Sequence, residues 1–329
     1  MALPPVLSAL RLPVIGAPLF IISNPKLVIA QCTAGIVGAF PALNAREATG
    51  DPPMLEAWLK EITEALDRHN QANPDRPAAP YAVNQIVHRS NGRLERDIEI
   101  CHRWQVPVWI TSLGARVEVN QAAHDCGGIA LHDVINDRFA RKAIEKGADG
   151  LIAVAAGAGG HAGTTSPFAL IQEVRTWFDG PVYLSGAIAT GQAVLAAQAM
   201  GADGAYVGSA FIATDEANAA DDYKTMIVEG SSEDIVYSSL FTGVHGNYLK
   251  GSIRRAGMDP EALPDSDPSK MNFADGSSKP KSWKEIWGAG QGIGAVQTVE
   301  SAGAVVARLT REYDAARARL GLAARHAAE

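Results

Sequence analysis

Cysteine is scarce in this sequence. Only three cysteines occur among 329 residues, and they lie far apart. None belongs to a CxxC pair, so the chain offers neither a disulfide framework nor the paired thiolates of a structural zinc site. Such a set is typical of a protein from a reducing compartment, and we expect no metal site. The three are Cys32, Cys101 and Cys126.

Long apolar runs and basic runs are also missing. No uncharged apolar stretch reaches membrane-spanning length without glycine interruptions. The N-terminus carries three prolines before Ile15 and no basic region, which is unlike a signal peptide. Lys and Arg total 29 against 36 Asp and Glu, with no Lys/Arg cluster of the kind that binds nucleic acid. We therefore expect a soluble, cytoplasmic protein that binds neither nucleic acid nor membranes.

Apolar residues are abundant, at 47% of the chain, which is ample for a large core. Eight short apolar runs rich in β-branched residues recur, each followed by a turn and then a helical stretch. Runs with little alternation are typical of parallel strands buried on both faces. Eight such units predict an α/β protein with a (β/α)8 TIM barrel, because an open sheet usually has fewer strands. The eight runs are Leu12–Pro18, Gly35–Phe40, Tyr81–Ile86, Val106–Ser112, Gly128–Asp133, Gly150–Ala155, Val182–Ala187 and Ala205–Gly208.

Two of the intervening helical stretches end in a matching pattern. Residues 146–150 read KGADG and residues 200–204 read MGADG. Glycine at this place suits the C-cap of a helix that leads directly into the next strand.

The pattern changes after the eighth run. We expect residues 1–214 to form the barrel and residues 215–329 to form a helical elaboration packed on it as one functional unit. Within the second part, the sequence predicts a helix, a polar loop over Asp259–Lys281, and a final charged helix over Val299–Leu320. The connection Asn44–Pro80 is longer than a normal loop between a strand and a helix.

Two small-residue turns follow the seventh and eighth strands, where barrels often bind a phosphate. The first contains Ser185, Gly186 and Ala187, and the second contains Gly208 and Ser209. Small residues let backbone N–H groups approach an anion, the serines add hydroxyl donors, and a following helix N-terminus favours negative charge. Either turn alone could be an ordinary tight connection, but two on adjacent strands favour a phosphate site.

The sixth strand leads into a loop almost without side chains. Its GxGxxA pattern, from Gly157 to Ala162, resembles a dinucleotide fingerprint, but no acidic residue follows about 20 residues later as that fold requires. We expect a loop against which a flat ligand can lie, with contacts from Gly159 and Gly160. His161 is framed by these glycines at the catalytic end of a strand and is suited to proton transfer, although a lone histidine is more often structural.

Weaker candidates end the fifth and third strands. His132 and Asp133, and likewise Asn84, could contact a ligand or could be satisfied by the backbone. HExxH, GxSxG and P-loop motifs are absent from the sequence. No lysine closes a predicted strand, which disfavours a Schiff-base aldolase.

Taken together, these residues resemble the nitronate monooxygenase family (formerly 2-nitropropane dioxygenases), which are FMN-dependent barrel enzymes. The likeness covers nearly the whole chain, including Gly16–Leu19 and Trp287–Gly292, and its most specific element is Ala158–Gly163. The resemblance implies FMN over the barrel mouth, with His161 in the position of the catalytic base. The FMN contacts that it implies are Ala17, Pro18, Leu19, Asn84, Asp133, Gly159, Gly160, Ser185, Gly186, Ala187, Gly208, Ser209 and Gln291.

The resemblance also implies a reaction. His161 would remove the proton alpha to the nitro group of a nitroalkane, and the flavin would oxidise the nitronate with O2 to a carbonyl compound and nitrite. Some members carry a basic residue in place of Asp133 and a glutamine in place of Gly16, so their redox behaviour does not transfer directly. Two alternatives remain: an NAD(P)H-dependent reductase of quinones or enoyl thioesters on the same scaffold, and a non-redox barrel that binds a phosphorylated metabolite. Assembly into a homo-oligomer is left open.

Overall fold

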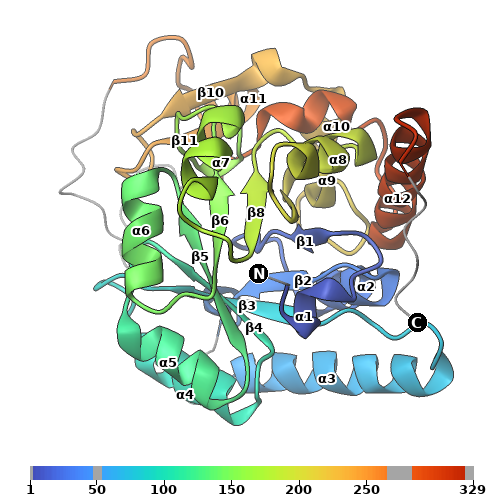
Figure 1. The fold of residues 1–329 in the computed structure, drawn as a ribbon. Helices are drawn as coiled ribbons and strands as arrows, with labels where there is room; N and C mark the ends of the chain where they lie inside the picture. The colour runs from blue at the N-terminus through green and yellow to red at the C-terminus, as the bar shows by residue number, and fades with distance from the viewer. Residues whose placement is uncertain (1–2, 47–53, 265–283, 323–329) are drawn as a thin grey trace.

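The computed structural model describes residues 3–46, 54–264 and 284–322. Its centre is a barrel of eight parallel strands surrounded by helices, which confirms the predicted fold (Figure 1). Each of the eight apolar runs contributes one strand. The strands are β1 (Val14–Gly16), β2 (Gly38–Pro41), β3 (Tyr81–Ile86), β4 (Val108–Ser112), β5 (Ile129–Val134), β6 (Gly150–Val154), β8 (Val182–Ser185) and β9 (Gly204–Val207).

The strands follow one another around the barrel in chain order. Hydrogen-bonded neighbours run from β2 through β3, β4, β5, β6, β8 and β9 to β1. The ring closes through a parallel bridge between Ile15 and Val37, where the Gly16 N–H donates to the Val37 carbonyl at 2.7 Å. Because all eight strands are parallel, their carboxyl ends meet at one rim, and the residues that follow them are brought together there.

Helices cover the outside of the barrel and bury apolar residues against it. The longest, α3, buries Leu55, Leu59, Ile62 and Leu66 at helical spacing and fills most of the long connection after β2. The expected glycine caps are confirmed, since Gly147 and Gly201 follow helix ends with φ of +88° and +108°. The outer helices are α2 (Pro25–Ala34), α3 (Met54–Ala72), α4 (Leu94–Arg103), α5 (Val117–Asp125), α6 (Asp137–Glu145), α7 (Pro167–Arg175), α8 (Gly191–Ala199) and α12 (Ala302–Arg319).

The barrel interior is packed with side chains. Along β4, Val108 and Ile110 belong to the inner cluster, whereas Trp109 between them packs against the outer helices. The short N-terminal helix α1 (Pro5–Ser8) adds Leu7 to the inner cluster, and Leu10 joins it from the next turn. The amino end of the barrel is thereby filled, which leaves the carboxyl end for a ligand.

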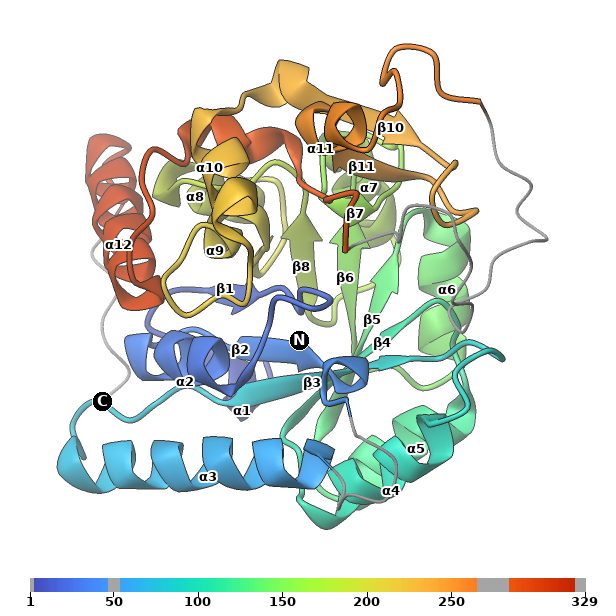
Figure 2. The ribbon, with the colours of Figure 1, turned by 180° about the vertical axis from the view of Figure 1, so that it is seen from behind.

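A small antiparallel sheet lies over the carboxyl ends of β6 and β8 (Figure 2). Its strands are β10 (Ile235–Ser238), β11 (Gly246–Leu249) and β7 (Gly160–His161), paired in that order. The sequence after residue 215 predicts only helix and loop. Helices α10 (Asp221–Glu229) and α11 (Lys250–Arg255) are present there, after the short helix α9 (Ser209–Ile212) that follows β9, but the hairpin was not predicted.

The C-terminal helix α12 falls inside the predicted span 299–320 and packs against α8 and α2. The predicted polar loop lies mostly outside the described residues, because residues 265–283 are not described. Within the part of the chain that is described, no helix is both long and apolar enough to cross a membrane.

Candidate active site

A cavity of about 580 Å³ opens at the carboxyl end of the barrel. This is within the usual size range for small-molecule sites. Every residue proposed from the sequence lines it except Gln291, whose side chain is exposed and whose N–H donates to the Gly157 carbonyl at 2.9 Å. The proposed residues that line the cavity are Ala17, Pro18, Leu19, Asn84, Asp133, Gly159, Gly160, His161, Ser185, Gly186, Ala187, Gly208 and Ser209.

The turn after β8 has a backbone that few sequences allow. Gly186 has φ of +146°, and a Cβ there would lie 2.8 Å from the Ala156 carbonyl oxygen, so glycine is required. Ala187 has φ of +54°, a conformation that costs energy in a residue with a side chain. The Ala187 N–H donates to the Gly157 carbonyl at 3.2 Å, which holds the turn against the loop after β6.

The segment Trp287–Gly292 crosses both loops at close range. The Gly290 N–H donates to Ser209 Oγ at 2.9 Å, so the Ser209 hydroxyl proton remains available to donate to a ligand. A Cβ on Gly290 would lie 2.7 Å from the Gly157 oxygen, and one on Gly292 would lie 2.8 Å from the Ala187 backbone. Glycine is therefore needed for this backbone-to-backbone contact.

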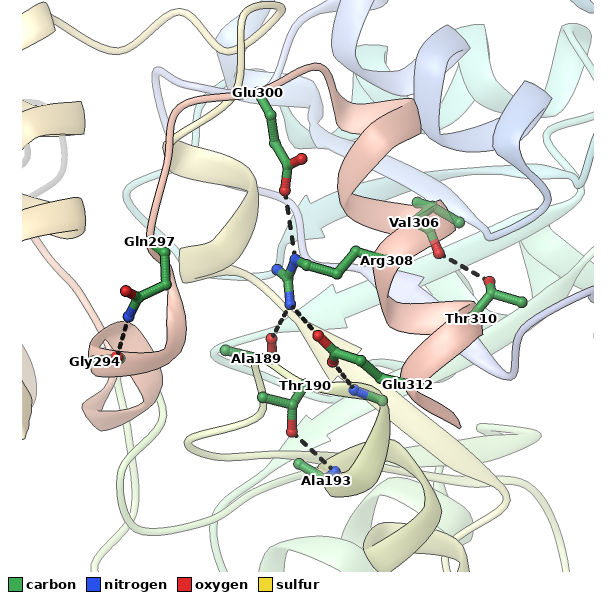
Figure 3. Close-up of polar contacts among 11 residues, drawn as sticks. Ala189, Thr190, Ala193, Gly294, Gln297, Glu300, Val306, Arg308, Thr310 and Glu312 are labelled. Atoms are coloured by element: carbon green, nitrogen blue, oxygen red, sulfur yellow. Dashed lines mark hydrogen bonds and ion pairs between the residues drawn. The ribbon is translucent and has the colours of Figure 1, made fainter. Parts of the chain in front are cut away.

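The N-terminus of α8, which we expected to attract an anion, is capped by the protein itself (Figure 3). The Gly191 N–H donates to Glu312 Oε2 at 2.7 Å. Arg308 Nη1 donates to Glu312 Oε1 at 3.0 Å and to the Ala189 carbonyl at 3.3 Å. Residues of α12 therefore hold the connection between Ser185 and α8 in place. The positive end of the α8 dipole is neutralised by the carboxylate of Glu312.

Replacing Glu312 with alanine should destabilise the protein by about 2 kcal/mol, because the Gly191 N–H loses its cap and Arg308 loses one of its two carboxylate partners in the described residues, keeping only Glu300. The measurement is the free energy of unfolding from urea denaturation. Asp314→Ala is the matched control, since Asp314 is exposed on the same helix and the charge change is identical. Equal losses in the two variants would show that the Glu312 contacts contribute nothing specific.

His161 is held by the small sheet. It forms β7, paired to Gly246 of β11, and its Nε2 lies 2.8 Å from Thr242 Oγ1. The Thr242 hydroxyl is placed to donate to the Val244 carbonyl at 3.0 Å, and with its proton there Nε2 is the donor to Thr242 Oγ1. Nδ1 then holds the lone pair. Burial lowers the pKa of His161 to about 4, so the imidazole is neutral at neutral pH.

A chain of polar side chains runs across β3, β4 and β5 at the rim. Asn84 Nδ2 donates to Ser112 Oγ at 2.7 Å, and Ser112 Oγ donates to Asp133 Oδ2 at 2.5 Å. Burial raises the pKa of Asp133 to about 7. His132 also lines the cavity, with Nδ1 2.5 Å from Thr111 Oγ1, and burial lowers the pKa of His132 to about 4.

Ser112 and Thr242 were not predicted from the sequence as site residues. Ser112 is the last residue of a predicted strand and therefore belongs to the same rim, so its position was available from the pattern. Thr242 lies in the β10–β11 turn, and no local signal marked it.

Comparison with known proteins decides the family. A family model described as nitronate monooxygenase matches residues 6–312. The chain belongs to the nitronate monooxygenase family. It is therefore a flavin-dependent oxidoreductase by family, and the resemblance drawn from the Ala158–Gly163 loop is confirmed.

The relatives within and around this family are distant. A nitronate monooxygenase from Neurospora crassa is 26% identical over 339 residues, covering 91% of this chain and 88% of the relative. A Mycobacterium tuberculosis protein described as a monooxygenase is 31% identical over 202 residues, so the chain spans only about half of that relative, 54%. Nitroalkane oxidase from Streptomyces ansochromogenes has the same fold, with a TM-score of 0.75 at 23% identity over 94% of this chain and 98% of the other.

Proposed function

We propose that the chain binds FMN at the barrel mouth and oxidises alkyl nitronates with O2, giving a carbonyl compound and nitrite. The observation that carries the proposal is the arrangement of one cavity. A glycine loop, two small-residue turns on adjacent strands and the neutral imidazole of His161 all face it. Family membership supports the flavin, and the residues of this chain favour FMN.

The cavity wall fits FMN in three respects. The turns after β8 and β9 supply Ser185 and Ser209 hydroxyls beside Gly186 and Gly208, which suits one terminal phosphate. Among the described residues there is one such pair of turns and no second pair for a pyrophosphate, so FMN is preferred over FAD. The loop at Gly159 presents backbone and no side chain, so a flat ring system can approach it closely.

The chain's own residues then have defined tasks. His161 takes the proton alpha to the nitro group of a neutral nitroalkane at Nδ1, because Thr242 holds the proton on Nε2. A nitronate is already an anion and needs no base. Bound flavin supplies the redox chemistry, taking electrons from the nitronate and passing them to oxygen.

We also propose that residues 1–214 and 215–329 work as one unit. Thr242, which orients His161, and Gly290, which bonds Ser209, both come from the second part. Neither part therefore holds a complete site.

Spectra of the purified protein test this function. We expect flavin absorbance, release of FMN on denaturation, and bleaching of the flavin by a nitronate without oxygen, with nitrite formed when oxygen is admitted. Bleaching by NADPH but not by a nitronate would identify a reductase instead. A colourless protein that FMN cannot reconstitute would favour a barrel that binds a phosphorylated metabolite without redox chemistry.

A further inference from the structure

A buried oxygen of Asp133 is left without a partner at the rim of the cavity. Asp133 Oδ2 accepts the hydrogen bond from Ser112, but Oδ1 has no hydrogen-bond partner within the described part of the chain. The side chain also lines the cavity. A buried polar atom that lacks a partner is costly, so this oxygen is suited to bind a ligand.

The direction of the hydrogen bonds decides which Asp133 oxygen can carry a proton. Asn84 donates to Ser112, and Ser112 passes its own proton to Oδ2. Oδ2 is thus occupied as an acceptor. When the carboxyl group is neutral and Ser112 remains the donor to Oδ2, the carboxyl proton is on Oδ1, which has no hydrogen-bond partner in the described part of the chain.

The charges around the cavity leave Asp133 uncompensated. Tyr206 of β9 acts on it electrostatically and is itself neutral, since burial and Asp133 raise the pKa of Tyr206. His132 and His161 line the same cavity and are neutral at neutral pH. Lys142 of α6 also lines it but forms no ion pair with Asp133 in the described residues. Without a compensating cation, burial favours the protonated carboxyl group.

We propose that Asp133 acts as a neutral carboxylic acid whose Oδ1 donates a hydrogen bond to the flavin ring, and that its ionisation makes the flavin harder to reduce. The oxidised ring has carbonyl oxygens and unprotonated nitrogens that can accept this bond. Once Asp133 is ionised, the donor is lost and a negative charge faces a ring that must gain electrons. This inference rests on the flavin site of the proposed function, and it assigns Asp133 a positioning and tuning role.

Sulfite affinity measures this effect without catalytic turnover. Sulfite adds to oxidised flavin and leaves negative charge on the ring, so a nearby anion weakens its binding. Asp133→Asn keeps the size and an N–H donor but cannot ionise. We expect wild type and Asp133→Asn to bind sulfite equally near about pH 5.5, and the variant to bind it roughly tenfold more tightly near about pH 8.5. The ionisation of sulfite itself cancels in this ratio.

Asp314→Asn serves as the control, because Asp314 is an exposed carboxylate on α12, away from the cavity lining. The sulfite affinity of Asp314→Asn, divided by that of wild type, should stay constant with pH. If the ratio of sulfite affinities for Asp133→Asn and wild type is also constant with pH, the proposal is overturned. If the variant does not retain flavin, infrared titration of wild-type protein decides instead. A protonated carboxyl band near about pH 5.5 that is missing in Asp133→Asn upholds the proposal, and its absence overturns it.

These outcomes separate the two proposals. Flavin-loaded protein that shows the pH-dependent ratio but oxidises no nitronate upholds the role of Asp133 and contradicts the proposed function. Protein that oxidises nitronates but shows a sulfite-affinity ratio that is constant with pH upholds the proposed function and contradicts the role of Asp133. Protein that takes up no flavin overturns both.

Discussion

His161→Asn should reduce the turnover of neutral nitroalkanes by roughly 100-fold or more, the usual range for loss of a general base. Turnover of the corresponding nitronates should fall much less, because these substrates arrive already deprotonated. Asparagine keeps a polar side chain of modest size but lacks a basic ring nitrogen. The measurement is the rate of nitrite formation from a nitroalkane and from its nitronate, in wild type and in His161→Asn.

The pH dependence supplies a second readout for the same residue. A base must be deprotonated, so wild-type turnover of nitroalkane should rise as the pH increases through the pKa of His161. Burial lowers this pKa to about 4, which places the rise on the acidic side and leaves the rate level through neutral pH. The variant should lack this rise.

His245→Asn provides the matched control for the loss of an imidazole. His245 is exposed and stacks on Tyr237 with ring centroids 5.0 Å apart, outside the cavity lining. Its replacement should leave both substrates nearly unaffected. Equal losses on nitroalkane and nitronate in His161→Asn would assign His161 to ligand positioning, and no loss on either would assign it a structural role.

The barrel could be predicted from the sequence because its strands are buried on both faces. Such strands appear as continuous apolar runs, and the parallel order then follows from the helices between them. The pattern at residues 146–150 and 200–204 was equally informative, since Gly147 and Gly201 adopt the positive φ of a helix cap. The apolar runs and the glycine caps are local signals, and both predict the alternating strands and helices of the barrel.

The small sheet could not be predicted because its pairing is not local. Its edge strand β7 contains only Gly160 and His161, and its partner β11 lies more than 80 residues further along the chain. Two residues show no periodicity, and glycine is unfavourable in a strand. The hydrogen bond between His161 and Thr242 depends on this pairing, so the partner of the imidazole followed only from the structure.

The cavity wall was more predictable than the contacts behind it. Residues near the carboxyl ends of parallel strands meet at one rim, which is why Asn84, Asp133 and Ser185 could be grouped from the pattern, although Asn84 lies two residues before the end of β3 and does not end that strand as expected. The cap on α8 could not be foreseen, because Glu312 comes from a helix that packs there only in the folded chain. The role of Gln291 as a flavin contact stays a prediction.

Gly208→Leu should weaken FMN binding by at least about 100-fold while leaving the barrel folded. The backbone tolerates a side chain here, since Gly208 has φ of −113°. A Cβ at this position would lie 3.4 Å from Ala17 Cβ and from Leu19 Cδ2, which is ordinary contact. The rest of a leucine would then occupy space beside two proposed ring contacts, where the ligand belongs. The dissociation constant of FMN, measured by fluorescence titration of flavin-free protein, gives the size of the effect.

Gly208→Ala separates exclusion of the ligand from damage to the fold. Its single added methyl makes only the ordinary contacts with Ala17 and Leu19, so FMN affinity should fall far less than in the leucine variant. Both variants should keep the circular dichroism spectrum of wild type and unfold within a few degrees of it, because the cavity has room for the added atoms when no flavin is bound. A leucine variant that retains FMN at wild-type affinity would show that the phosphate does not lie beside Gly208, and the proposed placement of the flavin would then be wrong.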